Sequence, residues 1–468
     1  MRPTRNPRNG RVDYQMPECS ATEVLQASQA LRVSQTGWHA LGVAARAAVL
    51  LRWVGALRQN KDALVAALRA DTGRQAEAVL EFDATVGAIE RWCALAPALL
   101  ADEAPRRASI PFVRIEQRRC PYPVIGVISP WNWPLLLSLI DAVPALLTGC
   151  AVLIKPSEFT PRFVDPLRDT LAQVAELQTV LRYVTGGAET GQALVQSVDA
   201  VCFTGSVATG RRVGAAAMAA FIPSFLELGG KDPALVLADA DLARAARSLA
   251  WGGMVGAGQS CMSIERVYVD ATVATRFTEL LVQQVSALQL NWPDIDHGQI
   301  GPIIAAPQVA TVQRHLAEAL AGGARALTGG QVVNHDGGWW CEPTVLVDVT
   351  PDMSVVTEET FSAILPVMTF ATEKQGIALA NGGDFGLSAA VFSNDLEHAR
   401  TVASQLQAGA ISINDSSLTA LVHDAAKQSF KLSGLGGSRM GPASLSRFYR
   451  QQALLINEAP ASPWWFGN

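Results

Sequence analysis

The residue in this chain best suited to covalent chemistry is Cys261, which follows Gly258-Gln259-Ser260. A thiolate is the strongest protein nucleophile for a carbonyl carbon, and no histidine lies close in sequence to indicate a protease-like Cys–His pair. In isolation, a cysteine after a glycine-rich turn is about four times more often a small buried apolar residue than a nucleophile. Its assignment therefore depends on the residues that accompany it.

A candidate partner is Glu227, in the segment Glu227-Leu228-Gly229-Gly230-Lys231 at the end of an apolar stretch. A carboxylate in such surroundings suits a general base. The two glycines allow another group to approach closely. The alternative, a surface glutamate paired with Lys231, is equally consistent with this segment alone.

Asn132 lies between two prolines in Pro130-Trp131-Asn132-Trp133-Pro134, directly after an apolar strand. Ligands bind at the carboxyl ends of parallel strands, and an asparagine amide there can donate a hydrogen bond to a developing oxyanion. An asparagine in a simple turn is about twice as common an explanation for this motif on its own.

Two further segments are suited to a nucleotide. Lys155-Pro156-Ser157-Glu158 places an ammonium and a carboxylate at a strand end, where both can bind ribose hydroxyls, although a solvated loop has the same composition. In Phe203-Thr204-Gly205-Ser206 a strand ends and a helix begins, so backbone N–H groups and the Ser206 hydroxyl are available to a phosphate. No GxGxxG fingerprint follows any predicted strand.

These residues must be positioned by an alternating α/β region. Residues 21–100 carry apolar positions at three- and four-residue intervals, which predicts helices, with a break at 71–73. After residue 122, continuous apolar strands alternate with amphipathic helices, which predicts a parallel sheet covered on both faces. The predicted elements are strands at 113–119, 122–129, 151–155, 181–185, 200–204 and 223–228, helices at 134–147 and 161–175, a short helix after Glu189, a helix from Ala208, and a second α/β region from about 234 to 414.

Composition limits the class of protein. The 468 residues suffice for about three domains, and 49% hydrophobic against 17% charged residues predicts a large core. A net charge of −5 disfavours nucleic acid as the main partner. We interpret the basic segment 1–11 as a frayed terminus rather than a signal peptide, and the interrupted apolar stretch 134–154 disfavours a membrane span. Seven irregularly spaced cysteines and six scattered histidines favour a reducing cytoplasm and no metal site.

Taken together, these motifs resemble those of a known protein family. From about residue 20 to about 455 the chain resembles the aldehyde dehydrogenase superfamily, through PWNxP, KPSE, FTGSxxxG, ELGGK and GQxCxxxxR. The separation of Glu227 and Cys261, 261 − 227 = 34 residues, is the one that the family shows. Further matches are Glu358-Glu359-Thr360-Phe361, Asn381 to Leu387, Gly409 to Asn414 and Lys431-Leu-Ser433-Gly434.

The resemblance implies a catalytic sequence. Cys261 attacks an aldehyde to give a thiohemiacetal, whose oxyanion is held by Asn132 and the backbone N–H of Cys261. Hydride transfer to NAD(P)⁺ leaves a thioester, which Glu227 hydrolyses by activating water. NAD⁺ is favoured, with NADP⁺ as the alternative, because Glu158 is suited to the ribose 2′-hydroxyl and repels a 2′-phosphate.

The resemblance also implies binding residues. The expected cofactor contacts are Ser129, Pro130, Trp131, Lys155, Ser157, Glu158, Gly187, Gly191, Phe203, Thr204, Gly205, Ser206, Leu228, Gly229, Glu359 and Phe361. The expected substrate funnel, with no Lys or Arg to hold a carboxylate, consists of Trp133, Leu137, Trp251, Val255 and Met262. We therefore expect an aromatic or a medium-to-long aliphatic aldehyde rather than a semialdehyde acid.

The implied fold is α/β and aldehyde dehydrogenase-like. It has a doubly wound NAD-binding domain (1–105 and 122–229), a second α/β catalytic domain (230–428), and a small β oligomerisation arm with a C-terminal tail (106–121 and 429–468). The expected assembly is a cytoplasmic homodimer, with a tetramer as the alternative. The tail contains Trp464-Trp465-Phe466, which we expect to pack on a neighbouring subunit rather than on a membrane.

The chain departs from the family pattern at three places. Asp141 stands where some members carry a lysine that relays protons from the base, which leaves the route of the Glu227 proton open. The Gly and Pro of EExFGP are Ser362 and Ala363 here, which predicts altered loop stiffness with cofactor binding kept. PFGG is replaced by residues 426–429 (AKQS) at the substrate entrance, so the substrates of close relatives are a poor guide.

Three alternatives stay open within this interpretation. A CoA-acylating relative passes the thioester to a thiol, but such enzymes usually lack the glutamate that is Glu227 here. A semialdehyde dehydrogenase of the same superfamily needs a cation for the second carboxylate. A non-catalytic binding protein on this fold is free to lose Cys261 or Glu227, and both are present.

Overall fold

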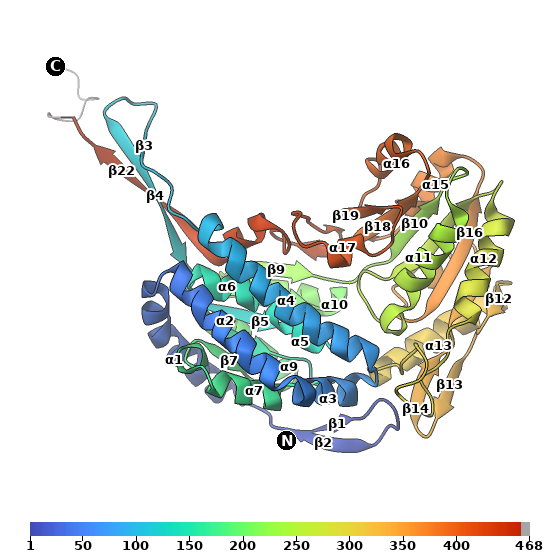
Figure 1. The fold of residues 1–468 in the computed structure, drawn as a ribbon, viewed down its shortest axis with the longest axis horizontal. Coiled ribbons are helices and arrows are strands. Elements are labelled where there is room, and N and C mark those ends of the chain that lie inside the picture. The colour runs from blue at the N-terminus through green and yellow to red at the C-terminus, as the bar shows by residue number, and fades with distance from the viewer. Residues whose placement is uncertain (460–468) are drawn as a thin grey trace.

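The computed structural model describes residues 1–459, which form two α/β lobes side by side, with a narrow arm projecting from the first lobe (Figure 1). The lobes are centred on a six-stranded and a seven-stranded sheet. This architecture confirms the predicted α/β fold class. The predicted packing of Trp464-Trp465-Phe466 concerns residues outside the described part of the chain.

The first sheet has the strand order β21-β9-β8-β5-β6-β7, and all its neighbours pair in parallel except β21 with β9. The register aligns Ile128 with Lys155 and with Phe203, and Thr204 with Glu227, so the strands end at one common edge. The strands are β5 (Val124–Ile128), β6 (Ala151–Lys155), β7 (Leu181–Tyr183), β8 (Ala200–Thr204), β9 (Ser224–Glu227) and β21 (Gly434–Leu435).

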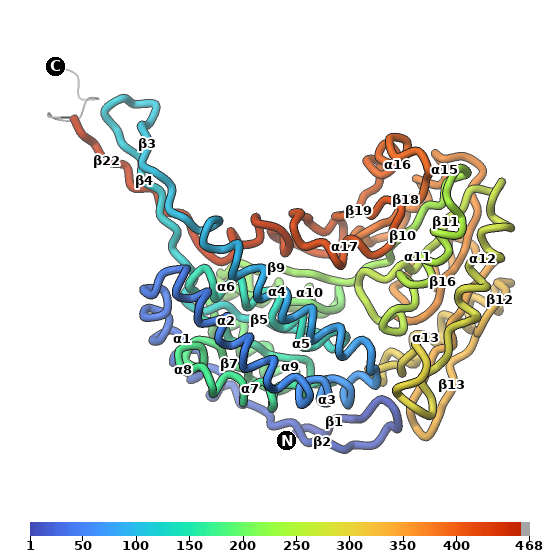
Figure 2. The backbone as a smooth tube through the Cα atoms, in the orientation of Figure 1, coloured from blue at the N-terminus to red at the C-terminus, as the bar shows by residue number. Residues whose placement is uncertain are grey.

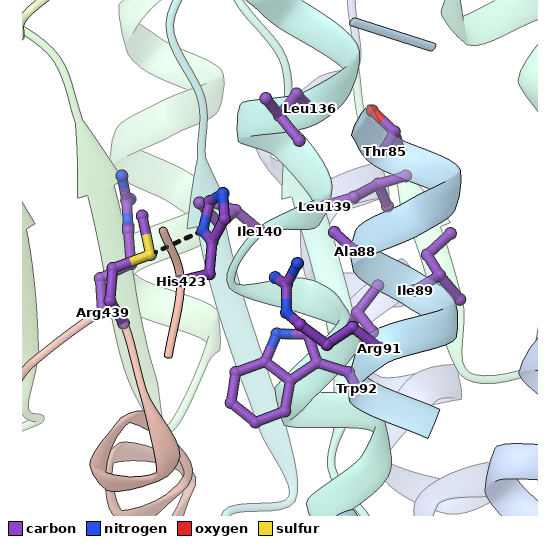
Figure 3. A pocket seen from close by; sticks show the side chains of 12 residues that line it. Thr85, Ala88, Ile89, Arg91, Trp92, Leu136, Leu139, Ile140, His423 and Arg439 are labelled. Atoms are coloured by element: carbon purple, nitrogen blue, oxygen red, sulfur yellow. Dashed lines mark hydrogen bonds between the residues drawn. The ribbon is translucent and has the colours of Figure 1, made fainter. Parts of the chain in front are cut away.

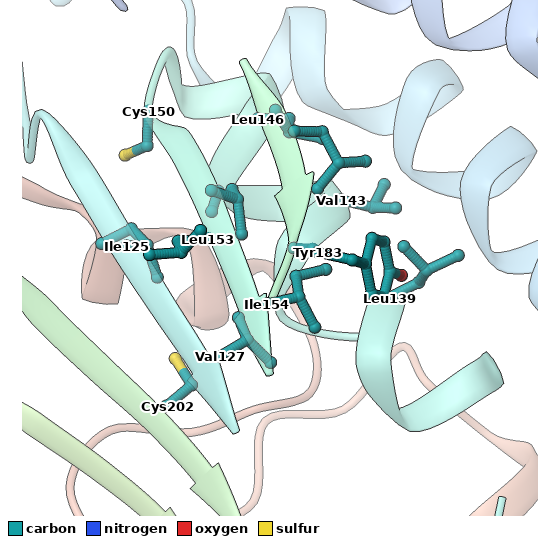
Figure 4. Close-up of a cluster of buried hydrophobic side chains, with 14 of the residues drawn as sticks. Ile125, Val127, Leu139, Val143, Leu146, Cys150, Leu153, Ile154, Tyr183 and Cys202 are labelled. Atoms are coloured by element: carbon teal, nitrogen blue, oxygen red, sulfur yellow. The ribbon is translucent and has the colours of Figure 1, made fainter. Parts of the chain in front are cut away.

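Helices cover both faces of this sheet and bury its apolar side chains. Figure 4 shows Leu139, Val143 and Leu146 packed toward β5 and β6. Burial of each such aliphatic side chain contributes about 1.5–3 kcal/mol. The helices are α1 (Ala21–Ala40), α2 (Val43–Gln59), α3 (Lys61–Thr72), α4 (Ala76–Leu99), α5 (Pro134–Leu139), α6 (Ala142–Thr148), α7 (Val164–Ala172), α8 (Ala175–Gln178), α9 (Ala188–Ser197) and α10 (Val207–Ala219).

The single helix predicted at 134–147 is two helices, because α5 ends at Leu139 and α6 begins at Ala142. Pro144 has no N–H to donate, and its ring conflicts with a helical carbonyl four residues earlier, at Ile140. The chain therefore breaks at residues 140–141, and the break places Asp141 in the interior.

The second sheet has the order β12-β15-β16-β11-β10-β18-β19. β9 and β10 follow one another in the chain and belong to different sheets, so the domain boundary proposed at 229–230 falls between the sheets. The elements of this lobe are β10 (Asp232–Val236), α11 (Leu242–Met254), η1 (Val255–Gly258), β11 (Ile264–Asp270), α12 (Ala274–Ser286), α13 (Ala306–Ala321), β12 (Arg325–Thr328), β13 (Val332–His335), β14 (Gly338–Cys341), β15 (Thr344–Val347), α14 (Ser354–Thr357), β16 (Ile364–Phe370), α15 (Glu373–Ala380), β17 (Phe385–Gly386), β18 (Ser388–Phe392), α16 (Leu396–Ala403), β19 (Ala410–Ile413), α17 (Leu418–Leu421) and β20 (Phe430–Lys431).

The arm is a three-stranded antiparallel sheet of β3 (Arg106–Arg107), β4 (Val113–Pro121) and β22 (Tyr449–Asn457). β4 and β22 pair along their whole lengths, from Tyr449↔Pro121 to Asn457↔Val113. Of the segment 429–459, which we assigned to the arm and tail, only its last part lies in the arm. β21 joins the first sheet instead, and η2 (Pro442–Phe448) packs against α6.

The interpretation of residues 1–11 as a frayed terminus is wrong. β1 (Arg2–Arg5) pairs with β2 (Val12–Met16), and the hairpin runs along both lobes (Figure 2). Arg8 donates to the side chain of Asn291 at 3.0 Å. Such partners lie far along the chain, so local composition gives no sign of them.

Residues 1–459 contain no single helix that is long and apolar enough to cross a membrane. Helices α1 and α2 reach the necessary length and apolarity only as a pair, with a bend of 115° between them. The same residues contain no group of three or more His, Cys, Asp or Glu side chains arranged to hold a metal ion.

Candidate active site

The candidate catalytic residues come from both lobes and meet at the common edge of the first sheet. Asn132 follows β5 and Glu227 is the last residue of β9, whereas Cys261 lies in the loop between η1 and β11 of the second lobe. The Asn132 side chain donates from Nδ2 to the Gln259 carbonyl at 3.0 Å, two residues before the cysteine. Gly230 packs so closely against the Cys261 carbonyl that a Cβ there would collide with it.

The Cys261 thiol is half-buried and surrounded by carboxylates. Burial raises its pKa most, the negative charges of Glu227, Glu359 and Asp232 raise it further, and the cation of Arg439 opposes them, so that the pKa is about 12. The resting residue is therefore a thiol at neutral pH, and a base must take its proton before it attacks.

The turn before this cysteine depends on glycine. Residues 256–258 adopt left-handed φ values of 61°, 58° and 68°. Any side chain at Gly258 would also collide with the Ser362 backbone. The fully buried Gln259 side chain then anchors the turn, because it donates to the Pro302 carbonyl at 3.0 Å and accepts from the Ile304 N–H at 3.0 Å.

Arg74 also builds this site, although no sequence motif pointed to it. Its buried guanidinium donates to the carbonyl of Asn132 and, at 3.1 Å, to that of Gly256, and it lies 5.1 Å from the ring centre of Trp133. It thereby ties the Asn132 loop of one lobe to the Cys261 turn of the other. One N–H of the Asn132 amide is held by Gln259, which leaves the second for an oxyanion. The only sequence signal was an arginine directly after the predicted helix break at 71–73.

Glu227 is bonded by the C-terminal segment and not by Lys231. Its Oε2 accepts from the Ser429 hydroxyl at 3.1 Å. Lys231 instead donates from Nζ to Glu265 at 2.6 Å and to Thr360 at 2.9 Å. The alternative interpretation, a surface glutamate paired with Lys231, is therefore wrong, and the Glu227 carboxylate stays available to the site.

The loop that carries Glu359 and Phe361 is fixed although its Gly and Pro are replaced. Glu265 accepts the N–H of Phe361 at 2.8 Å, and Glu359 accepts that of Gly230 at 2.9 Å. The Phe361 ring meets Trp131 edge-on at 5.2 Å between centres. Burial, and then the charge of Glu265, raise the pKa of Glu359 to about 8.

Asp141, which stands in place of a relay lysine, is fully buried between two arginines. Arg439 and Arg447 donate to its two oxygens at 2.7 and 2.8 Å. Burial by itself raises the pKa of Asp141, but the two guanidinium groups outweigh burial and hold this pKa below its usual value. Asp141 therefore stays ionised and does not carry a proton. Its charge instead holds the cation of Arg439 in the interior. Arg439 also donates to Thr204, which is paired with Glu227 across β8 and β9.

Arg439 also borders a narrow cavity between α4, α5 and residues 423–440, which Figure 3 shows from close by. His423 lies beside it and contacts the Met440 sulfur at 3.0 Å. The rest of the lining is mainly apolar and includes Ala88, Ile89, Trp92, Leu136, Leu139, Ile140 and Val143.

The predicted funnel residues lie on different sides of the site. Trp251 and Val255 line a groove between the start of α4 and residues 288–300. Met262 instead lies against Lys427, whose Nζ is 3.5 Å from its sulfur and 2.9 Å from the Thr419 carbonyl. Lys427, which belongs to the AKQS replacement, therefore stands beside one of the predicted funnel residues.

Several of the residues predicted to bind a dinucleotide carry groups suited to that role. Lys155 Nζ lies 2.9 Å from Glu158 Oε2, so the predicted ribose site has both a donor and an acceptor. The buried Ser129 hydroxyl at the end of β5 has no partner in the described protein, as expected for a group that meets a ligand. Ser206 is the N-cap of α10, where its hydroxyl accepts the Thr209 N–H at 3.3 Å. The dipole of this helix favours a phosphate.

The chain is similar to known proteins along nearly its whole length. Residues 2–454 match the model of the "Aldehyde dehydrogenase family". A solved structure described as aldehyde dehydrogenase PutA from Anabaena variabilis has a TM-score of 0.98 and 49% identity, covering 99% of both chains.

Two curated relatives have different named substrates. One is 4,4'-diapolycopene aldehyde oxidase of Methylomonas sp, 37% identical over 88% of this chain and 77% of its own. The other, from Mycolicibacterium smegmatis, carries the name succinate-semialdehyde dehydrogenase [NADP(+)] and is 33% identical over 97% and 88%. Solved structures among the matches hold NAD or NADP. With a family match over nearly its whole length and relatives above 30% identity, the chain belongs to the aldehyde dehydrogenase family.

Proposed function

We propose that this protein oxidises an aldehyde to the free carboxylic acid, with Cys261 as the nucleophile and Glu227 as the base. The observation that carries the proposal is the convergence of a thiol, an amide donor and a carboxylate from two lobes at one sheet edge. Since the pKa of the thiol is about 12, its proton must leave before attack, and Glu227 helps to accept it.

The oxyanion that forms on attack has two donors within the chain. They are the second N–H of the Asn132 amide and the backbone N–H of Cys261. Loss of one such donor typically lowers the rate by about 10²–10³. Buried Arg74 keeps this arrangement rigid by bonding the backbone of both the Asn132 loop and the Cys261 turn, and buried Gln259 anchors the turn to Pro302 and Ile304.

NAD(P)⁺, when bound, supplies the hydride acceptor. Lys155 and Glu158 are placed to hold the adenosine ribose, and the N-terminus of α10 to hold the pyrophosphate. Glu359 and Phe361 are placed for the nicotinamide half. The Glu158 carboxylate supports use of NAD⁺, since it is suited to a 2′-hydroxyl.

Hydrolysis of the thioester then depends on Glu227 activating water. The Ser429 hydroxyl orients its carboxylate, and Arg439 lies one strand away at Thr204. Because a buried, permanently charged arginine does not pass on protons, Glu227 returns its proton to solvent by another path. The presence of Glu227 favours water over CoA as the acceptor of the acyl group.

We propose an apolar substrate, either aromatic or medium-to-long aliphatic, because the five predicted funnel residues are all apolar. Lys427 supports a second candidate, an aldehyde that also carries a carboxylate. The test compares kcat/KM for hexanal to decanal and benzaldehyde with kcat/KM for succinate semialdehyde, with Lys427→Met as the variant. A preference for the semialdehyde that disappears in Lys427→Met would overturn the apolar proposal.

The catalytic assignment has its own test. Cys261→Ala should abolish aldehyde oxidation and keep cofactor binding, whereas Glu227→Gln should form the acyl-enzyme and stall. A mass shift equal to the acyl group on Cys261, seen by mass spectrometry in Glu227→Gln alone, is the expected result. Unchanged turnover in either variant contradicts the mechanism.

A further inference from the structure

Arg2 reaches the site that is placed to hold the adenosine ribose. Its Nη1 lies 3.8 Å from Glu158 Oε1, and its Nε lies 3.6 Å from Glu18. The guanidinium also lies directly against Gly187 at the N-terminus of α9, where any Cβ would collide with it. The side chain therefore lies between Glu158, which follows β6, and the N-terminus of α9.

The hairpin fixes this position. Arg2 pairs with Met16, which is fully buried. The chain after Met16 is bonded to the end of the first sheet, because the Cys19 N–H donates to the Thr185 carbonyl at 2.8 Å and the Thr185 hydroxyl donates to the Pro17 carbonyl at 2.7 Å.

The charges at this position differ from those that Glu158 alone provides. Lys155 at 2.9 Å and Arg2 at 3.8 Å flank the Glu158 carboxylate on its two oxygens. With Glu18 beside Arg2, two cations and two anions balance at this position, whereas a lone glutamate would repel a phosphate. Once Glu158 turns aside, Lys155, Arg2 and Glu18 leave one net positive charge. A guanidinium presents a planar set of N–H donors that matches phosphate oxygens in pairs.

We propose that Arg2 is a recognition residue for the 2′-phosphate of NADP⁺, so that this chain accepts NADP⁺ as well as NAD⁺. With NAD⁺, Glu158 accepts from the 2′-hydroxyl and Arg2 stays on Glu158. With NADP⁺, Glu158 turns aside and Arg2 and Lys155 bind the phosphate. This inference rests on the proposed cofactor site, and it adds which of the two nucleotides that site accepts.

The test is direct binding by calorimetry to adenosine 2′,5′-bisphosphate and to 5′-AMP, which differ by the 2′-phosphate. Arg2→Ala should weaken binding of the bisphosphate about 10- to 100-fold, the usual range for charge-assisted bonds to phosphate, and leave 5′-AMP within about threefold. The ratio of kcat/KM for NADP⁺ to that for NAD⁺ should fall by a similar factor. Arg2→Lys should retain part of the preference for the bisphosphate, since lysine keeps the positive charge but lacks the paired N–H donors of the guanidinium.

Arg5→Ala is the matched control, because Arg5 belongs to the same strand but points to the Gly337 carbonyl in the other lobe. It should leave both affinities unchanged, with melting temperatures reporting on the fold of every variant. If Arg2→Ala leaves the ratio of kcat/KM for NADP⁺ to that for NAD⁺ unchanged, or weakens binding of the bisphosphate and of 5′-AMP equally, Arg2 does not recognise the 2′-phosphate. Failure of the unmodified protein to bind either nucleotide would instead overturn the proposed function.

Discussion

At the scale of single residues, the surroundings of the Cys261 thiol set its response to pH. Since burial and three carboxylates raise its pKa to about 12, the thiolate fraction, and with it alkylation by iodoacetamide, should rise about tenfold per pH unit from pH 7 to 10. Glu227→Gln removes one of these negative charges, which lowers the thiol pKa and should speed alkylation at each pH in this range. Peptide mass spectrometry isolates this site from the other free cysteines. Full reactivity already at pH 7 would contradict this account.

Arg439 offers a second test at this scale, because its charge lies near both Cys261 and Glu227. Arg439→Met should slow the first burst of NAD(P)H formation, because the thiol pKa rises without this charge. It should lower the steady-state rate more, by about tenfold, since one charged contact is worth about 1.5–3 kcal/mol and only part of it concerns hydrolysis. Arg447→Lys is the control. Arg447 bonds the same Asp141 but stacks on Phe448 at 4.8 Å. Equal loss of burst and steady state would show that Arg439 does not act on the second step.

At the scale of elements, Glu81 of α4 secures the N-terminus of α5, the helix that follows Asn132. It is buried, and its carboxylate accepts the N–H groups of Leu135 and Leu136 at 2.8 and 3.0 Å. Burial raises its pKa in the folded state to about 7, above the ordinary value of 4.5. The folded protein therefore holds this proton more tightly, and the contribution of Glu81 to stability falls as pH rises from about 4.5 to 7.

Glu81→Gln keeps the acceptor oxygen and removes the ionisation. The melting temperature of this variant, relative to the unmodified protein, should therefore be higher at pH 8 than at pH 5. Glu77→Gln is a control on the same helix, since Glu77 bonds the Gly256 N–H from a less buried position. If the difference in melting temperature between Glu81→Gln and the unmodified protein is the same at pH 5 and pH 8, or is smaller at pH 8, ionisation of Glu81 does not affect stability.

At the scale of the whole molecule, the arm exposes apolar side chains. It is a thin sheet with neither face covered by the described chain, and it carries Ile115, Leu454 and Ile456 half-exposed and Leu455 69% exposed. Projecting strands that expose apolar side chains are usually covered by another chain. We expect a second copy to cover it, giving a homodimer. Leu455→Lys should yield monomers in light scattering, whereas Val33→Lys, at a position 81% exposed on α1, should not. Dimers in both variants would exclude this interface.

Much of the site could be predicted from local sequence, because several of its residues lie at or directly after the ends of apolar strands. The predicted strands 151–155 and 200–204 are observed with these bounds, and apolar runs bounded by turn residues are a local signal. Once the strands are parallel and in register, the residues after them must lie at one edge. This is why Asn132, Lys155 and Glu227 could be grouped by their place after apolar strands, and why the family could be recognised from its motifs.

The tertiary structure alone decided which charges surround those residues. Asp141 bonds Arg439 and Arg447, which follow it by 298 and 306 residues in the sequence. Lys427 contacts Met262, which precedes it by 165 residues. Arg2 reaches the ribose site only because a hairpin carries it there. Periodicity reports the faces of one element and not the partners of a side chain, so contacts made by packing distant segments leave no trace in local sequence. The sequence by itself determined the strand-end chemistry, and the packing of distant segments decided the electrostatics that act on it.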